Sequence, residues 1–261
     1  MMCRGLFLGA DRKGRVHMIS PEWHDELTST AEVLCARVRA GYVPDGTLLL
    51  AGRQTAGRGR GSAEEKPFYS PAGGCYMSLL LRGVCLAEVL PLTSRTALAA
   101  RRVLARYGCG TGVKWVNDLF CEGKKVGGIL VQRPAGGAAE DCTVVSCGIN
   151  LHPNPAEPPP ESLRGIMGWC FRDSSEAPDI KKIALALAEE IVRVAAEQDN
   201  GALLEEYREA SIVLGRNIQH EYNGLSVDAM ALDITPAGGL LVRHADGRET
   251  VLTSGSITLL F

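Results

Sequence analysis

Residues 51–61, AGRQTAGRGRG, restrict most strongly what this chain can fold into. They follow an apolar run, residues 48–50, that is typical of a buried strand. The segment holds three arginines and four glycines. Glycine lets a backbone approach a ligand closely, and arginine supplies fixed positive charge with a planar fork of donors. The pattern predicts an anion-binding loop at a strand end, with a solvated surface loop as the alternative for this segment alone.

Composition limits the partners and the compartment. A chain of 261 residues can bury one core, or form one large and one small domain. Its net charge of −2 gives no general attraction to nucleic acid, and no apolar run is long enough to cross a bilayer. Nine cysteines without paired spacing predict free thiols in a reducing compartment, the cytoplasm, and argue against structural zinc. Residues 1–10 are expected to be an ordinary leader or a first strand rather than a signal peptide.

Several segments have helical or strand patterns. Ser29 and Glu32 have the spacing of a capping box, which predicts a helix that begins at Ser29 and ends before Gly41 and Pro44. Apolar spacing and composition predict further helices over residues 93–107, 179–198 and 203–210. Short apolar runs predict strands over residues 48–50, 75–81, 113–116, 128–132 and 143–151. Residues 134–139 are expected to form a hairpin loop, and the proline-rich residues 153–160 an irregular connection.

The chain changes character after Ser211. From there to the last residue, short strand-like runs are separated by turn dipeptides at residues 223–224, 238–239, 246–247 and 254–255. Hairpin turns at this spacing predict a small antiparallel barrel. We therefore expect one domain over residues 1–212 and a second, small β-domain over residues 213–261.

Four further segments carry polar groups at the ends of predicted elements. They are Ser29-Thr30 at a helix N-terminus, Lys114-Trp115-Val116-Asn117-Asp118 after a strand, Lys124-Lys125 before a strand, and Ser146-Cys147-Gly148-Ile149-Asn150 at the end of the next. A helix N-terminus favours anions. Taken singly, each segment also has an ordinary interpretation: a helix cap, a hairpin turn, a solvated turn and a strand end.

The order and spacing of these segments resemble the biotin protein ligase family, which is related in fold to lipoate ligases and class II aminoacyl-tRNA synthetases. That family shows a Ser-Thr pair, a Gln-x-x-GRGRxG loop, and KWPND, K-x-x-GIL and G-x-G-x-N segments, and counterparts of all five occur here in that order. The resemblance is close over residues 29–150. It implies an α+β fold, a mixed central sheet flanked by helices, with a small C-terminal SH3-like barrel.

The resemblance implies a two-step reaction. Biotin carboxylate attacks the α-phosphate of ATP, giving biotinyl-5′-adenylate and pyrophosphate, and a lysine of a biotin carboxyl carrier domain then takes the biotinyl group and releases AMP. Clustered cations suit a reaction that joins negative groups, and a loop that orders over the adenylate would protect it from water.

The resemblance also implies roles for individual residues. Lys125 would bridge the biotin carboxyl and the α-phosphate, and Arg58 and Arg60 would act with it as catalytic residues that close the loop. The biotin-binding set implied is Ser29, Thr30, Gln54, Arg58, Gly59, Arg60 and Lys125. The set implied for ATP is Lys114, Asn117, Asp118, Asn150 and Phe68, with Mg²⁺ near Asn117 and Asp118, whose oxygens suit a hard cation.

The chain departs from the family pattern at four places. Ala31 replaces an asparagine, Val116 a proline and Ser146 a glycine. The family's adenine-stacking tryptophan is missing at its expected spacing, where residues 62–67 read as an insertion, and Phe68 or Tyr69 is the predicted replacement. These changes leave adenine recognition open and make reduced activity an alternative.

Two other functions stay open. One is a lipoate or octanoate ligase on the same scaffold, which would need a long apolar tunnel rather than a small pocket with polar ends. The other is a ligase-like module that binds without turnover, suggested by Ala31 and by the acidic residues 64–65. Only 28 residues precede Ser29, too few for the family's N-terminal DNA-binding module, so no DNA partner is expected. A homodimer through the central sheet is possible in this family.

Overall fold

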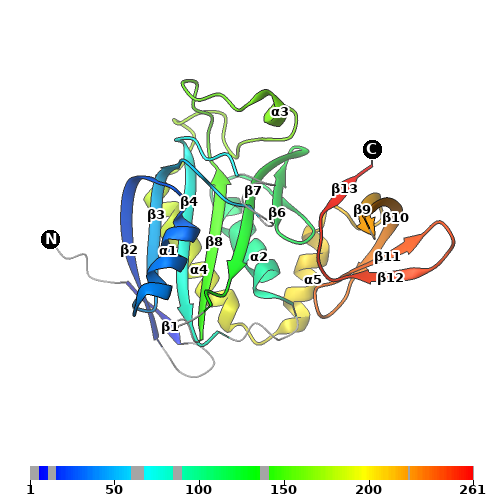
Figure 1. Ribbon diagram of the computed structural model, residues 1–261, viewed down its shortest axis with the longest axis horizontal. Helices are drawn as coiled ribbons and strands as arrows, with labels where there is room; N and C mark the ends of the chain where they lie inside the picture. The colour runs from blue at the N-terminus through cyan, green and yellow to red at the C-terminus, as the bar shows by residue number, and fades with distance from the viewer. Residues whose placement is uncertain are drawn as a thin grey trace.

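Two β-sheets organise the protein. The computed structural model describes residues 6–10, 16–59, 68–84, 90–135, 141–222 and 224–260. Within them, eight strands form a large sheet in the order β1-β2-β3-β4-β8-β7-β6-β5, and five form a C-terminal sheet in the order β12-β11-β10-β9-β13. In Figure 1 the large sheet lies between helices, and the C-terminal sheet lies beside β6 and α5.

The large sheet is mixed. Its strands are β1 (Leu6–Ala10), β2 (Val16–Leu27), β3 (Thr47–Gln54), β4 (Gly74–Arg82), β5 (Gly112–Lys114), β6 (Asp118–Cys121), β7 (Lys124–Gln132) and β8 (Cys142–Asn150). β2 and β3 run parallel, and the other neighbouring pairs are antiparallel. β4 is buried along nearly its whole length and pairs with β8, so these two strands form the centre of the sheet.

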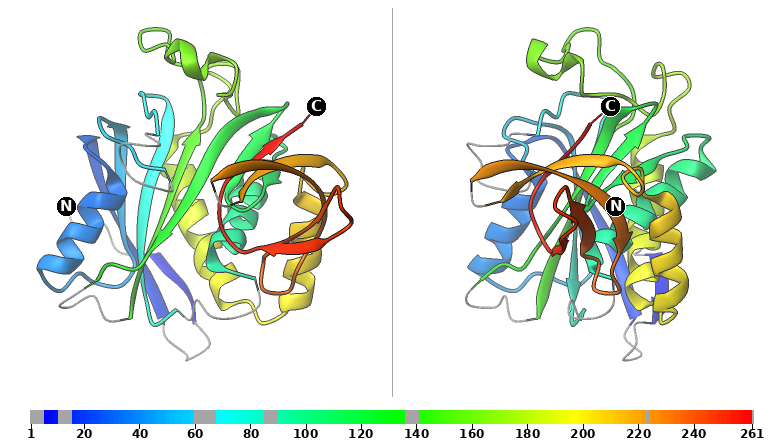
Figure 2. Two further views of the ribbon diagram at one scale, coloured as in Figure 1. Left: turned by 45° about the vertical axis from the view of Figure 1, so that its right-hand side comes forward. Right: turned by 90° about the vertical axis from the view of Figure 1, so that its right-hand side faces the viewer.

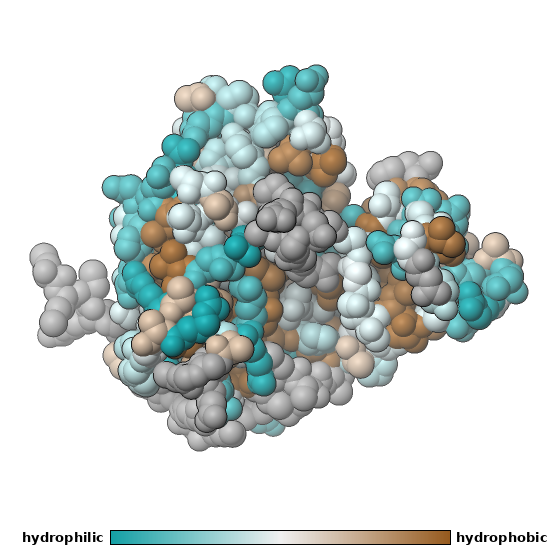
Figure 3. Space-filling model, in the orientation of Figure 1, coloured by the Kyte–Doolittle hydropathy of each residue, from teal (hydrophilic) through white to brown (hydrophobic). Residues whose placement is uncertain are grey.

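Helices cover both faces of this sheet. They are α1 (Thr30–Ala40), α2 (Leu92–Arg106), the short α3 (Glu161–Arg164), α4 (Ile180–Ala196) and α5 (Asn200–Ala210). α1 packs on β3, β4 and β8, whereas α4 packs on β1, β2 and β4 and against α2 on the opposite face. α1 buries Leu34, Cys35 and Val38, and its outer side is largely hydrophilic (Figure 3). The repeat of Ile183, Leu187 and Ile191 gives α4 the continuous apolar stripe that fixes it against the core.

The predicted capping box is wrong in its contacts. Ser29 does occupy the N-cap position of α1, but its side chain makes no capping hydrogen bond. The Thr30 N–H instead donates to the Gln54 side-chain oxygen at 2.8 Å, and the Glu32 carboxylate lies 3.5 Å from Arg58. A distant glutamine thus satisfies one of the free N–H groups in the first turn of α1.

The C-terminal sheet has the predicted hairpin organisation. Its strands are β9 (Asn217–Tyr222), β10 (Leu225–Ile234), β11 (Leu240–His244), β12 (Glu249–Leu252) and β13 (Ile257–Leu259), all antiparallel, and the sheet is strongly curled (Figure 2). Gly224, Gly238, Gly247 and Gly255 have positive φ in its turns, a conformation that glycine adopts without strain.

The C-terminal sheet is attached to the large sheet by polar contacts. The Trp115 indole donates to the Gly238 carbonyl at 2.9 Å, and Arg208 of α5 contacts Asp233 of β10 at 2.8 Å. Buried residues of both sheets belong to one hydrophobic cluster, which includes Val113 and Ile218. The two parts therefore pack as neighbours, and the boundary near Val213 stays a prediction.

Most predicted elements are present, with ends that differ by a few residues. The helices predicted over 93–107, 179–198 and 203–210 correspond to α2, α4 and α5, and residues 153–160 contain neither helix nor strand. The prediction missed β2 and β6. β2 carries Pro21, Asp25 and several other charged side chains, and β6 has only four residues, so neither shows a strand pattern. No helix in the described ranges is long and apolar enough to cross a membrane.

A buried carboxylate between α2 and α4, that of Glu190, is expected to stabilise the fold. Glu190 is 3% exposed and contacts Arg102 at 3.2 Å, Arg106 at 2.9 Å and Arg193. Burial raises the pKa of Glu190, but the arginine hydrogen bonds outweigh it and hold this pKa below its usual value. Glu190→Gln is expected to lower the free energy of unfolding at pH 7 by about 2 kcal/mol, since charge-assisted hydrogen bonds are lost.

The stabilisation that Glu190 provides depends on pH. A carboxylate with a lowered folded-state pKa stabilises the protein above its unfolded pKa of about 4.3, and this contribution disappears as the pH falls through the folded-state pKa. In urea unfolding, the difference between the wild-type protein and Glu190→Gln should therefore shrink on acidification. Glu189→Gln, at the neighbouring, partly exposed position, is the control. An unfolding free energy of Glu190→Gln equal to that of the control at pH 7 would contradict the prediction.

Candidate active site

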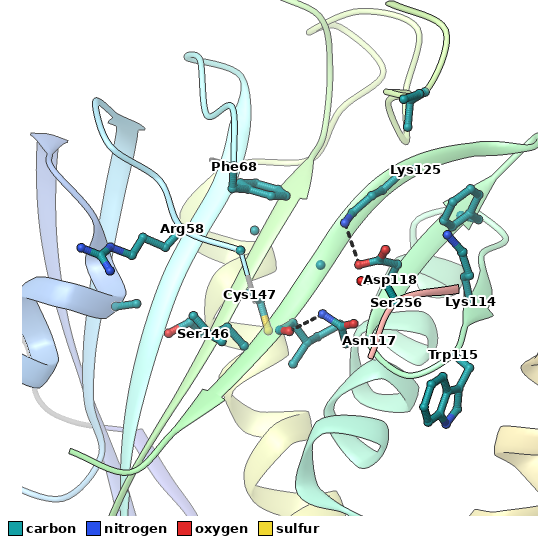
Figure 4. Close-up of a pocket in the computed structure, with 18 of the residues that line it drawn as sticks. Arg58, Phe68, Lys114, Trp115, Asn117, Asp118, Lys125, Ser146, Cys147 and Ser256 are labelled. Carbon is teal, nitrogen blue, oxygen red and sulfur yellow. Dashed lines mark hydrogen bonds and ion pairs between the residues drawn. The ribbon is translucent and has the colours of Figure 1, made fainter. Parts of the chain in front are cut away.

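A cavity of about 430 Å³ opens where α1, β3, β7, β8 and the turn between β5 and β6 meet. We call it the main cavity (Figure 4). The site residues predicted from sequence that line it are Ser29, Thr30, Gln54, Arg58, Gly59, Phe68, Lys114, Asn117, Asp118 and Lys125. Segments far apart in the chain therefore meet at one place, as their order suggested.

One wall of the main cavity carries an ion pair. The Lys125 ammonium on β7 lies 2.6 Å from the Asp118 carboxylate at the start of β6, and Figure 4 shows the two side chains pointing toward each other. Both are partly exposed, with 31% of the lysine side chain and 21% of the aspartate side chain accessible. The pairing of Phe120 with Lys125 aligns the two strands so that this contact forms. The pair supplies a positioned cation at the cavity surface.

The turn between β5 and β6 is fastened to β7. The Asn117 side-chain amide donates to the Ile129 carbonyl at 2.8 Å, and the Ile129 N–H donates to the Asn117 carbonyl at 3.0 Å. Asn117 is only 7% exposed, so its first role is to hold this turn in place. Its side-chain oxygen remains available as a ligand. Lys114, at the other end of the turn, lies over the Phe120 ring, 5.7 Å from the centroid.

The opposite wall carries a row of hydrogen-bonded polar side chains. The Ser146 and Ser78 hydroxyls are 2.8 Å apart, Ser78 donates to the Thr30 hydroxyl at 2.9 Å, and Thr30 donates to the Gln54 oxygen at 3.2 Å. The Gln54 amide in turn donates to Ser70 at 3.0 Å. We call Ser146, Ser78, Thr30 and Gln54 together the hydroxyl chain. Ser78 and Thr30 are buried, so the chain is held within the fold rather than by solvent.

The hydroxyl chain has a fixed direction. Each hydroxyl has a single proton, and the Ser78 proton is committed to Thr30, so Ser146 must donate its own proton to Ser78. Ser146 lines the main cavity. The lone pairs of its oxygen are therefore what it offers there, so this end of the cavity accepts an N–H from a ligand.

The three arginines of residues 51–61 differ in their positions. Arg58 lines the main cavity, and its guanidinium lies 3.5 Å from the Glu32 carboxylate. Arg53 is not among the lining residues and pairs instead with Glu26 at 3.3 Å and Glu157 at 3.2 Å. Arg60 and the insertion at residues 62–67 lie outside the described residues, so the predicted roles of Arg60 stay predictions.

Phe68 lies directly over Gly148. A Cβ at position 148 would approach the Phe68 ring to 2.5 Å, so only glycine fits under the ring without displacing it. The Phe68 ring also meets the Tyr76 ring edge-on, with 6.5 Å between centroids. An aromatic face thus lies at the cavity, which is where the sequence placed a replacement for the adenine-stacking tryptophan.

The structure does not bring Asn150 into the lining of the main cavity. Its amide donates to the Gly168 carbonyl at 3.1 Å, and its backbone carbonyl accepts from the Cys170 N–H at 2.9 Å. Asn150 thereby fixes the segment after α3, which contributes Ile166 to the cavity. Its predicted contact with a nucleotide stays a prediction.

Several residues in or behind the cavity wall were missed from the sequence. Ser78, which does not line the cavity but supports Ser146 from behind it, was hidden inside an apolar strand, where one polar residue in a fully buried run was the available signal. Ser256, Ile257 and Thr258 of the C-terminal sheet also line the main cavity, and no feature of their segment indicated it. Ser146 was noted only as a departure from a family pattern, although it begins the hydroxyl chain.

Comparison with known proteins shows which protein family this chain resembles. The model of the biotin/lipoate A/B protein ligase family matches residues 24–150, the part of the chain that supplies most of the main cavity. The biotin–(acetyl-CoA-carboxylase) ligase of Paracoccus denitrificans is 30% identical over 225 residues, covering 78% of this chain and 86% of that protein. The enzyme of the same name from Mycobacterium tuberculosis is 29% identical over 245 residues, covering 89% and 86%. The chain belongs to the biotin protein ligase family.

Other relatives are longer, and a solved structure supports the fold. The bifunctional ligase/repressor BirA of Bacillus subtilis is 35% identical over 142 residues, but this match covers 53% of the chain and only 42% of that protein. The chain therefore matches less than half of that relative's length. A biotin protein ligase from Aquifex aeolicus in complex with biotin and ATP superimposes with a TM-score of 0.76 and 25% identity, covering 92% of this chain and 98% of that one. The predicted fold class is thereby confirmed.

Proposed function

We propose that this protein is an ATP-dependent biotin–(biotin carboxyl carrier protein) ligase. The observation that carries the proposal is one cavity with a row of uncharged hydrogen-bonding groups at one side and the Lys125–Asp118 pair at the other. Biotin has the matching chemistry, a polar ureido ring and a carboxylate joined by an apolar tail. The similarity to biotin–(acetyl-CoA-carboxylase) ligases supports the same assignment.

In the first step, Lys125 neutralises charge. The biotin carboxylate attacks the α-phosphorus of ATP, the bond to the β-phosphate oxygen breaks, and pyrophosphate leaves. Both reactants are anions, so a cation between them lowers their repulsion and stabilises the charge that develops on the phosphoryl oxygens. The ureido ring would contact the hydroxyl chain, which orients the carboxylate toward Lys125.

The described residues fit a Mg²⁺ ion held mainly by substrate. Asp118 offers a carboxylate and Asn117 an amide oxygen, and the described part of the chain holds no cluster of three or more metal-binding side chains. Mg²⁺ commonly uses one or two carboxylates with substrate phosphates and waters. When bound, it would neutralise the pyrophosphate leaving group. Asp118 also holds Lys125, so ion and lysine would share one carboxylate.

In the second step, the carrier lysine attacks the mixed anhydride as a free amine. The new amide bond forms, the bond to the phosphate oxygen breaks, AMP leaves and one proton is released. Lys125 would stabilise the phosphate of the leaving AMP. The proposed acceptor is a carrier domain of a biotin-dependent carboxylase, with no part for DNA or membrane.

The test is substrate-dependent pyrophosphate release by the purified protein. With ATP and Mg²⁺, we expect release with biotin and little with lipoate or octanoate, and labelling of a carrier domain on its lysine. Release with lipoate alone would favour the lipoate ligase. Biotin binding without carrier labelling would favour the module that binds without turnover.

A substitution in the hydroxyl chain is expected to weaken biotin binding. Ser146→Gly restores the residue of the family pattern but removes the acceptor and leaves Ser78 with one partner fewer. We expect the KM for biotin to rise about 5-fold with kcat little changed, the effect of one lost hydrogen bond. Pyrophosphate release against biotin concentration measures both. Ser226→Gly, on the exposed part of β10, is the control. An unchanged KM would show that Ser146 does not contact biotin.

We also propose a cellular compartment, a domain division and an oligomeric state. The described cysteines are free, which supports a reducing compartment such as the cytoplasm. We retain a catalytic domain over residues 1–212 and an SH3-like domain over 213–261, although Ser256–Thr258 contribute to the main cavity. A homodimer through the central sheet is testable by light scattering.

A further inference from the structure

Three cysteines meet at the base of the β5–β6 hairpin, outside the main cavity. Cys109 follows α2, Cys121 ends β6, and Cys170 lies in the segment after α3. The sulfurs of Cys109 and Cys121 are 4.0 Å apart, and the Cys170 thiol is close enough to Cys109 to influence its pKa. We call these residues the thiol cluster. Within the described ranges, no group of three or more His, Cys, Asp or Glu side chains is placed to hold a metal ion.

A second cavity opens beside this cluster, where Cys121 is the cysteine that lines it. It has a volume of about 250 Å³ and is lined by Cys121 together with Gly110, Gly112, Glu122 and others. Cys109 is only 3% exposed, whereas Cys121 is partly exposed. A molecule the size of hydrogen peroxide fits such a space, while a bulky disulfide reagent does not reach a sulfur as buried as that of Cys109.

The two sulfurs differ chemically. Interactions with the thiols of Cys170 and Cys121 lower the pKa of the Cys109 thiol to about 7, against the effect of burial. Burial and the neighbouring Cys109 raise the pKa of Cys121 to about 11. For comparison, burial raises the pKa of Cys75, in the core, to about 12. Near neutral pH, therefore, Cys109 can supply a thiolate while Cys121 keeps its proton.

We propose that Cys109 and Cys121 form a reversible oxidation site for a hydroperoxide. The Cys109 thiolate attacks one peroxide oxygen, the O–O bond breaks, and the departing hydroxide takes up a proton to become water. Cys109 is then a sulfenic acid. The Cys121 sulfur attacks the Cys109 sulfur, its proton passes to the departing hydroxyl, and a second water leaves. Two thiols and one hydrogen peroxide thus give one disulfide and two waters, and a thiol reductant reverses the change.

The backbone around the pair can accommodate the bond. The sulfurs must approach to about 2.05 Å. Gly108 and Gly110 flank Cys109, and open space surrounds the Cβ position of each. Cys121 directly precedes the turn at Glu122 and Gly123. The disulfide would close a ring around the hairpin that bears Asp118, so the thiol state would be linked to the geometry of the main cavity.

The experiment uses the reduced full-length protein and hydrogen peroxide. After treatment near neutral pH, the remaining thiols are alkylated, counted by intact mass and assigned by peptide mapping. We expect two alkylatable thiols to be lost, a crosslinked peptide pair containing Cys109 and Cys121, and full recovery with dithiothreitol. The readout does not depend on ligase activity, so its failure would leave the proposed function untouched.

Variants separate the steps. Cys121→Ser should stop at the sulfenic acid on Cys109, which a 1,3-diketone probe traps, and Cys109→Ser should lose no thiols. Cys142→Ser, at a buried cysteine in β8, should behave like the wild-type protein. Circular dichroism verifies the fold of each variant. A wild-type protein that keeps all its thiols, a Cys109–Cys170 crosslink, or a tightly bound metal ion that protects the cluster would overturn the proposal.

Discussion

Lys125→Ala is expected to slow biotin-dependent pyrophosphate release by about 10²- to 10³-fold, the cost of removing one positioned group from a developing charge. The Lys125 ammonium is held 2.6 Å from Asp118, on an antiparallel strand pair. Its place is thus set before substrate binds. The loss should appear mainly in kcat, because the cation acts most strongly as negative charge develops on the phosphoryl oxygens.

The control for this variant lies one residue away. Lys124 is exposed and does not line the main cavity, so Lys124→Ala removes the same charge from the same strand. Its pyrophosphate release should stay within about 2-fold of the wild-type rate, because an exposed charge outside the site contributes little. Equal rates for the two variants would rule out the role proposed for Lys125. A thermal melt of each variant separates loss of activity from loss of fold.

Asp118→Asn is expected to reduce the adenylation rate about 10- to 100-fold, the range found when a supporting carboxylate of a metal site is removed. The substitution keeps the shape and one oxygen but deletes the charge. Lys125 then loses the partner that holds it at 2.6 Å, and Mg²⁺ loses its carboxylate ligand. The variant should therefore need more Mg²⁺ for half-maximal activity, which a magnesium titration of pyrophosphate release measures.

Glu122→Gln provides the matched comparison. Glu122 lies on the exposed turn after β6, four residues from Asp118, and does not line the main cavity, so its loss changes the net charge equally without altering that cavity. Its magnesium dependence should follow the wild-type curve. If Asp118→Asn also follows that curve while its rate falls, Asp118 positions Lys125 without binding the metal. A wild-type rate for Asp118→Asn would contradict both roles.

The sequence predicted what depends on local pattern. α4 was found because apolar residues recur on one face, and the C-terminal turns because glycine permits positive φ where hairpins need it. The candidate site was found because short motifs occur in a particular order. Ten of the predicted site residues line one cavity, since strand ends along one sheet bring their polar groups together.

What the sequence did not predict depends on contacts across the chain. Ser29 makes no capping hydrogen bond, and the first N–H of α1, at Thr30, donates instead to Gln54, which lies more than twenty residues further along the chain. Ser78 and Ser146 meet only because β4 and β8 pair in that register. The place of Ser256–Thr258 in the wall depends on how the C-terminal sheet packs, and no local pattern encodes that packing.

The contribution of Ser256–Thr258 to the cavity wall has a consequence for biosynthesis. These residues are translated after all the other segments that line the site, which run from Ser29 to Ile166. A growing chain can fold its large sheet as it emerges, because domains generally fold from the N-terminal end during synthesis. It cannot complete the cavity until β13 has left the ribosome and packed beside the β5–β6 turn. The cavity wall would thus be complete only after the C-terminal sheet has folded against the large sheet.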